Sequence, residues 1–386
     1  MQRRVAIYLI FVLCMVLNSG CWDQHDLTKM AIAVAVGYDR IASGDIELTV
    51  QIVRPDIIRA KPRGSEKEAS KTYSATGQTV FAAVRNLLET VDRKVFWSHT
   101  QLIVIGEKGG RQGITDLLDY LERDHETNRL APVLIGHDMT AKEIVEAQSE
   151  LEELPALHLK DLVMNNKSLA KIREIRFNEL LTTLNTPGYN PAIGVIHRTN
   201  QDEKLQIKDL KVEGLAVFQG DKLVGWLDEF ETRGYLFAKN QVQSGIIDVV
   251  NPKDEGKFVA FEIVRSSGKM DAIYQKGRLK FMIDIKAEGR LGDQQGGGNL
   301  LTDEMVLRLE KEVEREIRDN IKSALQKVQS EYGSDIFGFS EIVHKKYLNY
   351  WKQIKDNWQE IFVQTPVVIK VDWKTRSSGL IKNSTD

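Results

Sequence analysis

Short apolar runs alternate with amphipathic stretches through the first half of the chain. Apolar runs that end at glycine or polar turns predict buried strands, and apolar residues spaced three and four apart predict helices. The predicted strands are residues 30–36, 46–53, 102–105 and 133–135, with another apolar run at 192–196; the predicted helices are 79–88, 114–121, one that starts at 140–143, and helical segments over 151–184. This alternation predicts an α/β or mixed α+β domain.

Two of these helices carry specific expectations about burial. One face of helix 79–88 is expected to be buried through Val80, Phe81, Val84, Leu87 and Leu88, and helix 114–121 is expected to point Leu117, Leu118 and Leu121 inward. Thr140 and Glu143 form a capping box directly before an apolar pair, which is a fairly specific signal for a helix start. The charged segment 61–71 is typical of a mobile loop.

The second half of the chain predicts an antiparallel sheet and a long helix. After a polar stretch at 197–209, a tight turn at 219–222 joins residues 214–218 and 223–227 into a hairpin. Further strands are expected at 258–264, 278–285 and 367–373, with a glycine-rich loop at 292–299 and a second helix near 340–358.

The long helix is predicted over residues 303–332. Thr302 is expected to cap its start, Asp303 and Glu304 suit its positive end, and Gly333 is expected to stop it. An apolar stripe runs along it through Met305, Leu309, Val313, Ile317, Ile321, Leu325 and Val328. We expect this stripe to cover the sheet, since such faces are far commoner than seams for a partner helix.

The pattern predicts a multidomain α+β protein in which antiparallel or mixed sheets pack with helices. We expect a leader at 1–20, an N-terminal α/β domain at 21–198, a middle segment or small domain at 199–255, and a C-terminal α/β domain at 256–386 that contains helix 303–332.

The leader has the features of a secretory signal. Arg3 and Arg4 precede a thirteen-residue apolar run, residues 5–17, and Asn18, Ser19 and Gly20 follow. As a helix this run spans about 20 Å, too short for a bilayer core of about 30 Å. Its length suits a signal-peptide core followed by a cleavage site.

Cys21 stands directly after the small residues, as in the lipobox of bacterial lipoproteins. We expect lipidation of Cys21, and two acyl chains hold a protein stably at a membrane. Asn18 departs from the lipobox, which usually has leucine there. A secreted protein with an incidental cysteine and an uncleaved N-terminal anchor stay open as alternatives.

The bulk composition gives no footprint for nucleic acid. The 386 residues include 53 basic and 55 acidic side chains, for a net charge of −2. The two cysteines are Cys14 and Cys21, so a chain cleaved before Cys21 could form neither an internal disulfide nor a cysteine-based zinc site.

The sequence contains no catalytic motif. The seven histidines, at 25, 99, 125, 137, 158, 197 and 344, form neither HExxH nor another zinc spacing. His125, between Asp124 and Glu126, is expected at a solvated helix end, and His99 is expected to bond backbone groups at a strand entrance. Gly220 and Gly225 have P-loop spacing without the following lysine. We therefore predict a non-enzymatic protein without a cofactor or metal.

Four blocks of sequence resemble the Ger(x)C family, the lipoprotein C subunits of bacterial spore germinant receptors. They run in order over nearly the whole chain after the leader. The blocks are Gly20-Cys-Trp-Asp23 with Gly37-Tyr-Asp39; residues 95–107 (VFWSHTQLIVIGE); Gly214-Leu-Ala-Val-Phe218 with Gly225-Trp-Leu-Asp228 and Glu231-Thr-Arg-Gly234; and Asp335-Ile-Phe-Gly-Phe339 with Trp351, Trp358 and Phe362.

The resemblance implies a fold, a location and partners. Family members have three α/β-type domains and assemble with two polytopic membrane proteins, the A and B subunits, in the spore inner membrane. The receptor starts germination when small nutrients are sensed, and nutrient recognition is attributed mainly to the B subunit. For this chain the resemblance implies a lipid anchor at Cys21 on the outer membrane face and a role in assembly or signalling. It leaves open which nutrient acts and whether this chain binds it.

Two other functions remain as alternatives. A lipid-anchored solute-binding protein would need a ligand-sized cleft with a few convergent polar groups. A cell-wall or peptide hydrolase would need a perturbed acid/base pair in a cleft. Trp97, Trp226, Trp351 and Trp358 are expected to be core anchors under any of these functions.

Overall fold

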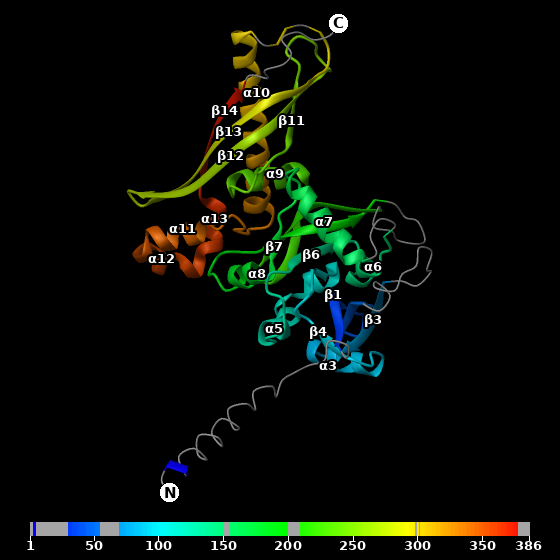
Figure 1. The fold of residues 1–386 in the computed structure, drawn as a ribbon. Helices are drawn as coiled ribbons and strands as arrows, with labels where there is room; N and C mark the ends of the chain where they lie inside the picture. The colour runs from blue at the N-terminus through cyan, green and yellow to red at the C-terminus, as the bar shows by residue number, and fades with distance from the viewer. Residues whose placement is uncertain are drawn as a thin grey trace.

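The computed structural model describes residues 3–4, 30–54, 69–149, 154–199, 209–297, 299–300 and 302–376. Within them, two sheets pack with helices, and α9 (Glu229–Ala238) lies between the two parts of the molecule (Figure 1). The α+β class predicted from the pattern is confirmed. Cys21 lies outside the described residues, so its lipidation stays a prediction.

The first sheet has a parallel centre and antiparallel flanks. Its main order is β10-β9-β8-β6-β5-β1-β2-β3; β4 pairs with β1, and β7 pairs with β6. Neighbouring strands among β1, β5, β6 and β8 are parallel. The strands are β1 Met30–Arg40, β2 Ile46–Val53, β3 Ser70–Gly77, β4 Lys94–Phe96, β5 Leu102–Ile105, β6 Pro132–His137, β7 Ile175–Arg176, β8 Ala192–Arg198, β9 Leu210–Gln219 and β10 Lys222–Leu227.

The central strands are apolar throughout because helices cover both faces of this sheet. Ile103 and Ile105 of β5 belong to one core, whereas Leu102 and Val104 belong to the core on the opposite face. The helices of this part are α3 Val80–Asn86, α4 Glu107–Gln112, α5 Thr115–Arg123, α6 Ala141–Val145, α7 Pro155–Lys167 and α8 Phe177–Leu184, with a 3-10 turn η2 at Leu87–Glu89.

The structure corrects several predictions in this half. Strand β1 continues past residue 36 to Arg40 because Tyr38 is fully buried. Strand β3 was not predicted, since its polar sequence forms a strand through pairing with β2. In helix α3, Val80 and Ala83 are buried, but Phe81 is 51% exposed, and Leu88 in η2 is 48% exposed. The inward leucines of α5 and the capping box at Thr140 are confirmed.

The second sheet has the order β11-β12-β13-β14 and packs against a long helix. Strands β11 to β13 pair antiparallel, and β14 pairs parallel to β13. These strands are β11 Ile246–Val250, β12 Phe258–Gln275, β13 Arg278–Gln294 and β14 Val367–Arg376, and the helices after α9 are α10 Asp303–Gln326, α11 Phe339–Lys346, α12 Leu348–Ile354 and α13 Trp358–Gln364, with a 3-10 turn η5 at Lys355–Asn357.

The apolar stripe of α10 is buried against this sheet and α9, as predicted. The helix passes into a π turn, η4 (Lys327–Glu331), and Gly333 follows with a φ of +58°. Thr302 occupies the N-cap position without a side-chain capping bond, contrary to expectation. The helix predicted over 340–358 is broken at Tyr347, so α11 and α12 are separate.

Residues 199–255 contribute to both sheets. The predicted hairpin is present as β9 and β10, which extend the first sheet, whereas β11 forms the edge of the second. One apolar core contains Leu215 and Val217 of β9 together with Phe261 and Phe281 of the second sheet. The division into domains at 198 and 255 stays a prediction.

Candidate functional site

Polar side chains gather at one edge of the first sheet, where its parallel strands end. Glu107 lies two residues after β5, His137 is the last residue of β6, and Asp138 follows it. His197, near the end of β8, pairs in register with His137. In open α/β sheets, ligands bind outside the carboxyl ends of parallel strands, so this edge is the first place to look for a site.

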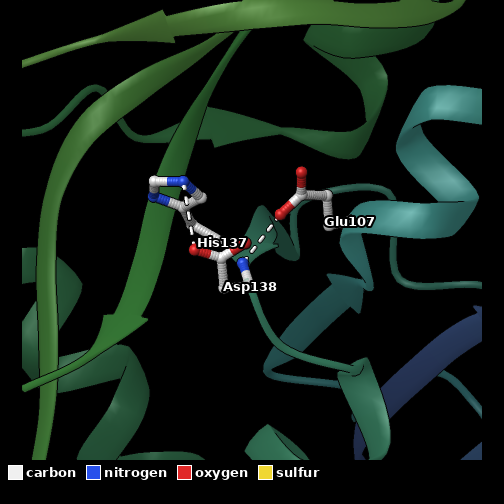
Figure 2. Close-up of side chains that lie close together, drawn as sticks. All are labelled: Glu107, His137 and Asp138. Carbon is white, nitrogen blue, oxygen red and sulfur yellow. Dashed lines mark hydrogen bonds and ion pairs between the residues drawn. The ribbon is translucent and has the colours of Figure 1, made fainter.

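Glu107, His137 and Asp138 form a compact cluster (Figure 2). One potential ligand atom from each residue lies within 4.8 Å of the others. However, both Glu107 oxygens are already engaged: Oε2 accepts the Asp138 backbone N–H at 2.7 Å, and Oε1 accepts the guanidinium of Arg111 at 2.7 Å. Asp138 has a φ of +52°. We interpret the cluster as a brace that holds this left-handed turn, because Arg111 neutralises the carboxylate a cation would need.

Asp39 fixes the same edge from β1. Its buried carboxylate accepts the N–H groups of Ala141 and Lys142 at 2.8 and 2.9 Å, so it ties the first turn of α6 to the sheet. Burial raises the pKa of Asp39, and these two hydrogen bonds oppose the rise. A Cβ at position 106 would lie 1.9 Å from Asp39 Oδ1, so only glycine fits there. Residues 37–39 (Gly-Tyr-Asp) and 106–107 (Gly-Glu), which both belong to blocks of the family resemblance, therefore lie together at this edge.

A cleft of about 950 Å³ opens beside the cluster. Its lining comes from the ends of β6 and β8, from β9 and β10, from the start of α9, and from Lys327 after α10. The rings of His137 and Trp226 stack with centroids 4.2 Å apart and a tilt of 31°. Trp226 is thus half-buried in a cleft wall, which corrects the expectation that it is a core anchor; Trp97, Trp351 and Trp358 are buried as expected.

Glu213 is the central acid of this cleft. Its Oε1 lies 2.6 Å from Lys211 Nζ and 3.8 Å from His197 Nε2. Its Oε2 is buried and has no hydrogen-bond partner among the described residues, and the same holds for Nε of Arg198. Burial lowers the pKa of His197, with smaller contributions from Lys211 and His137, whereas Glu213 opposes the decrease. His197 is therefore mainly neutral at neutral pH.

The cleft floor is tied to the C-terminal part of the chain. Tyr332 packs over Gly225, and its hydroxyl donates to the Trp226 carbonyl and accepts the Trp226 N–H, at 3.1 and 3.3 Å. Glu231 in α9 accepts the Lys327 ammonium at 2.9 Å. Gly225, Trp226 and Glu231, which stand in one block of the family resemblance, therefore all contact this C-terminal part or elements bound to it.

A second cavity, of about 990 Å³, is a groove between α3 and α5. Phe81, Val84 and Leu88 line it with Tyr120, and ion pairs such as Arg123–Asp119 lie along its rim. His125 lies at this rim with its side chain 92% exposed, which confirms a solvated helix end. His99 is exposed and packs its ring against Phe96, so the expected role in bonding backbone groups is not what the structure shows.

The sequence placed Gly214 and residues 226–228 in one block of the family resemblance, but it gave no sign that they line a cleft with His137, His197 and Glu213. His137 and His197 had no metal spacing, and nothing local connects them with Glu213 or Trp226. Only the strand order would have indicated them, because it brings the ends of β6 and β8 beside the β9–β10 hairpin. In the part of the chain that the structure describes, no helix is long and apolar enough to cross a membrane.

Two family models match the chain in succession. The model for the spore germination protein N-terminal domain matches residues 23–198, and the model for the C-terminal domain of the spore germination B3/GerAC-like proteins matches residues 213–379.

Full-length relatives and one solved structure agree with these models. Spore germination protein KC of Bacillus subtilis is 27% identical over 99% of this chain and 98% of its own length, and spore germination protein B3 of the same organism is 25% identical over 98% and 97%. The crystal structure of the GerBC protein has a similar fold, with a TM-score of 0.59, 20% identity, and coverage of 89% of this chain and 97% of that one.

The fold and these matches define the class of the protein as a spore germination protein. The chain belongs to the Ger(x)C family of spore germination proteins.

Proposed function

We propose that this protein is a lipid-anchored, non-catalytic subunit of a spore germinant receptor, needed for assembly or signalling in nutrient-triggered germination. The observation that carries the proposal is the end-to-end match: two germination family models together span residues 23–198 and 213–379. Relatives named as spore germination proteins align over 92–99% of this chain. A shared fragment would not give such coverage.

The proposed anchor is a lipid on Cys21, on the outer face of the spore inner membrane. Eight residues separate Cys21 from Met30, where β1 begins. Fully extended, this connection reaches about 30 Å. The tether would keep the first sheet close to the membrane surface and raise its effective concentration toward membrane partners.

The proposed partners are the two polytopic A and B subunits of the receptor. The protein would act on them through binding and not through catalysis. In support, the carboxylates of Glu107 and Asp39 hold backbone N–H groups, and Glu213 is paired with Lys211.

Exchanging the two cysteines separately tests the anchor. Cys21→Ala should move most of the protein from the membrane to the soluble fraction or leave it with an uncleaved leader, and should slow nutrient-triggered germination. Cys14→Ala is the matched control, because Cys14 lies within the apolar run and is not expected to carry lipid. Membrane fractionation, intact-mass measurement and germination rates give the result. The proposal would be contradicted if the Cys21→Ala protein had the same mass apart from the substitution, stayed in the membrane fraction and supported germination at the natural rate.

A further inference from the structure

The cleft between the two parts of the molecule contains a buried carboxylate oxygen without a donor. Glu213 has a side chain 16% exposed, and Lys211 Nζ lies 2.6 Å from its Oε1. Its Oε2 has no hydrogen-bond partner within the described chain. A buried, ionised oxygen without a donor is costly, because its lost hydration is not replaced. An N–H donor placed in the cleft would remove that cost.

The charges around the cleft favour a cation over an anion. Four carboxylates line it, from Asp138, Glu213, Asp228 and Glu229, against the two permanent cations Arg198 and Lys327. Lys327 is already paired with Glu231, 2.9 Å away. Two of the carboxylates are paired as well, Glu213 with Lys211 and Glu229 with Lys171. The second oxygen of Glu213 has no donor among the described residues, so an ammonium group in the cleft would still gain a partner there.

Aromatic side chains line the same cleft as this acid. Trp226 and His137 stack on each other in the cleft, and Phe230 from the first turn of α9 lines it with 52% of its surface exposed. Aromatic rings next to a carboxylate suit a small organic cation, since the rings contact its apolar part and attract its charge. The cleft volume of about 950 Å³ is in the range of small-molecule sites.

We propose that this cleft binds a small organic amine, whose ammonium group donates to Glu213 Oε2 and whose apolar portion lies against Trp226 and Phe230. Nε of Arg198 is also buried without a partner in the described structure. Its N–H would donate to an acceptor atom on a larger amine. This inference depends neither on the lipid at Cys21 nor on membrane partners, so it can fail or succeed independently of the proposed function.

Benzylamine is a suitable probe, with benzyl alcohol and benzoate as neutral and anionic counterparts of the same shape. The full chain would be labelled with ¹³C-histidine, and the signals of His137 and His197 would be assigned with His→Gln variants. We expect saturable shifts of both signals with benzylamine, and little or no shift with benzyl alcohol or benzoate. The His125 signal should stay unchanged, because His125 lies at the other cavity.

Two isosteric variants decide whether Glu213 is responsible. Glu213→Gln should weaken benzylamine binding about tenfold or more, because it removes a charge-assisted hydrogen bond. Glu229→Gln is the matched control: Glu229 lines the same cleft, but its carboxylate is paired with Lys171 at 2.8 Å, so binding should change little. Equal shifts with the amine and the alcohol, no saturation, or equal affinity in Glu213→Gln would each overturn the proposal.

Discussion

Single buried carboxylates hold much of this structure at the ends of helices. Asp335 is fully buried; its two oxygens accept the N–H groups of Gly338, Phe339 and Ser340 and the indole N–H of Trp358. Burial raises the pKa of Asp335, and the backbone hydrogen bonds oppose the rise. The string around Asp335 and the distant Trp358 thus form one hydrogen-bonded unit. Asp39 does the same for α6 in the first half.

The residue scale also gives a prediction about His197. Its pKa is lowered mainly by burial, and Glu213 opposes this shift. Replacing Glu213 with glutamine removes the nearby negative charge, so the pKa of His197 should fall further. NMR titration of the His197 ring in both proteins checks this. An unchanged or higher pKa in Glu213→Gln would show that the two side chains do not interact as the structure has them.

The same shift has a consequence for stability. A histidine whose folded pKa lies below its unfolded value of about 6.5 contributes stability above that pH, and the contribution is lost as the pH falls toward the folded pKa. Glu213→Gln should therefore lose stability more steeply than the natural protein between about pH 6.5 and the folded pKa. Urea unfolding at several pH values measures the difference.

At the scale of elements, α9 and α10 pack closely in the middle of the molecule. Gly234 of α9 faces the backbone of Asn320, and a Cβ on Gly234 would lie 2.2 Å from the Asn320 carbonyl oxygen. Arg233 extends the contact by donating to Asn320 Oδ1 at 3.1 Å and to the Ile246 carbonyl at 2.8 Å. Residues 231–234 (Glu-Thr-Arg-Gly) therefore form part of the contact between α9 and α10.

Gly234→Ala should destabilise the protein by about 1–3 kcal/mol, because the added methyl group forces two helix backbones apart. Gly110→Ala in α4 is the control: a Cβ there would meet Leu223 at 3.5 Å, an ordinary contact. Alanine at that position should leave stability unchanged or raise it by up to about 1 kcal/mol. Urea unfolding of both variants measures this; equal effects would argue against the tight α9–α10 contact.

Elements whose signal is local could be predicted from the sequence. The apolar run of β5, the leucines of α5 and the capping box at Thr140 each depend on neighbouring residues alone. Elements that depend on distant partners could not. The polar strand β3 exists through its pairing with β2, and Phe81 was assigned to a buried face although its side of α3 lines an open groove.

At the scale of the whole molecule, residues of the third and fourth blocks that resemble the family meet at one junction. The loop around Gly188 packs on Trp351 and Trp358, Ser334 donates to the Phe218 carbonyl, and Lys239 donates to the Phe337 carbonyl. Residues from the third and fourth blocks therefore hold the two sheets together.

The cleft could not be predicted in the same way. Its residues come from four separate strands, from the start of α9 and from the turn after α10, and no motif in the local sequence marks any of them as part of a cleft. Their meeting depends on the strand order, in which β8 lies between β6 and β9. Cys21, by contrast, was recognisable from its neighbours alone, and its role stays a prediction.

Affinity purification of the tagged full chain from spore membranes tests the central claim most directly. We expect two different polytopic membrane proteins to be recovered with the natural protein and with Cys14→Ala, and much less of both with Cys21→Ala. Recovery of the chain alone from solubilised membranes, or with soluble proteins only, would contradict its assignment as a subunit of a membrane receptor.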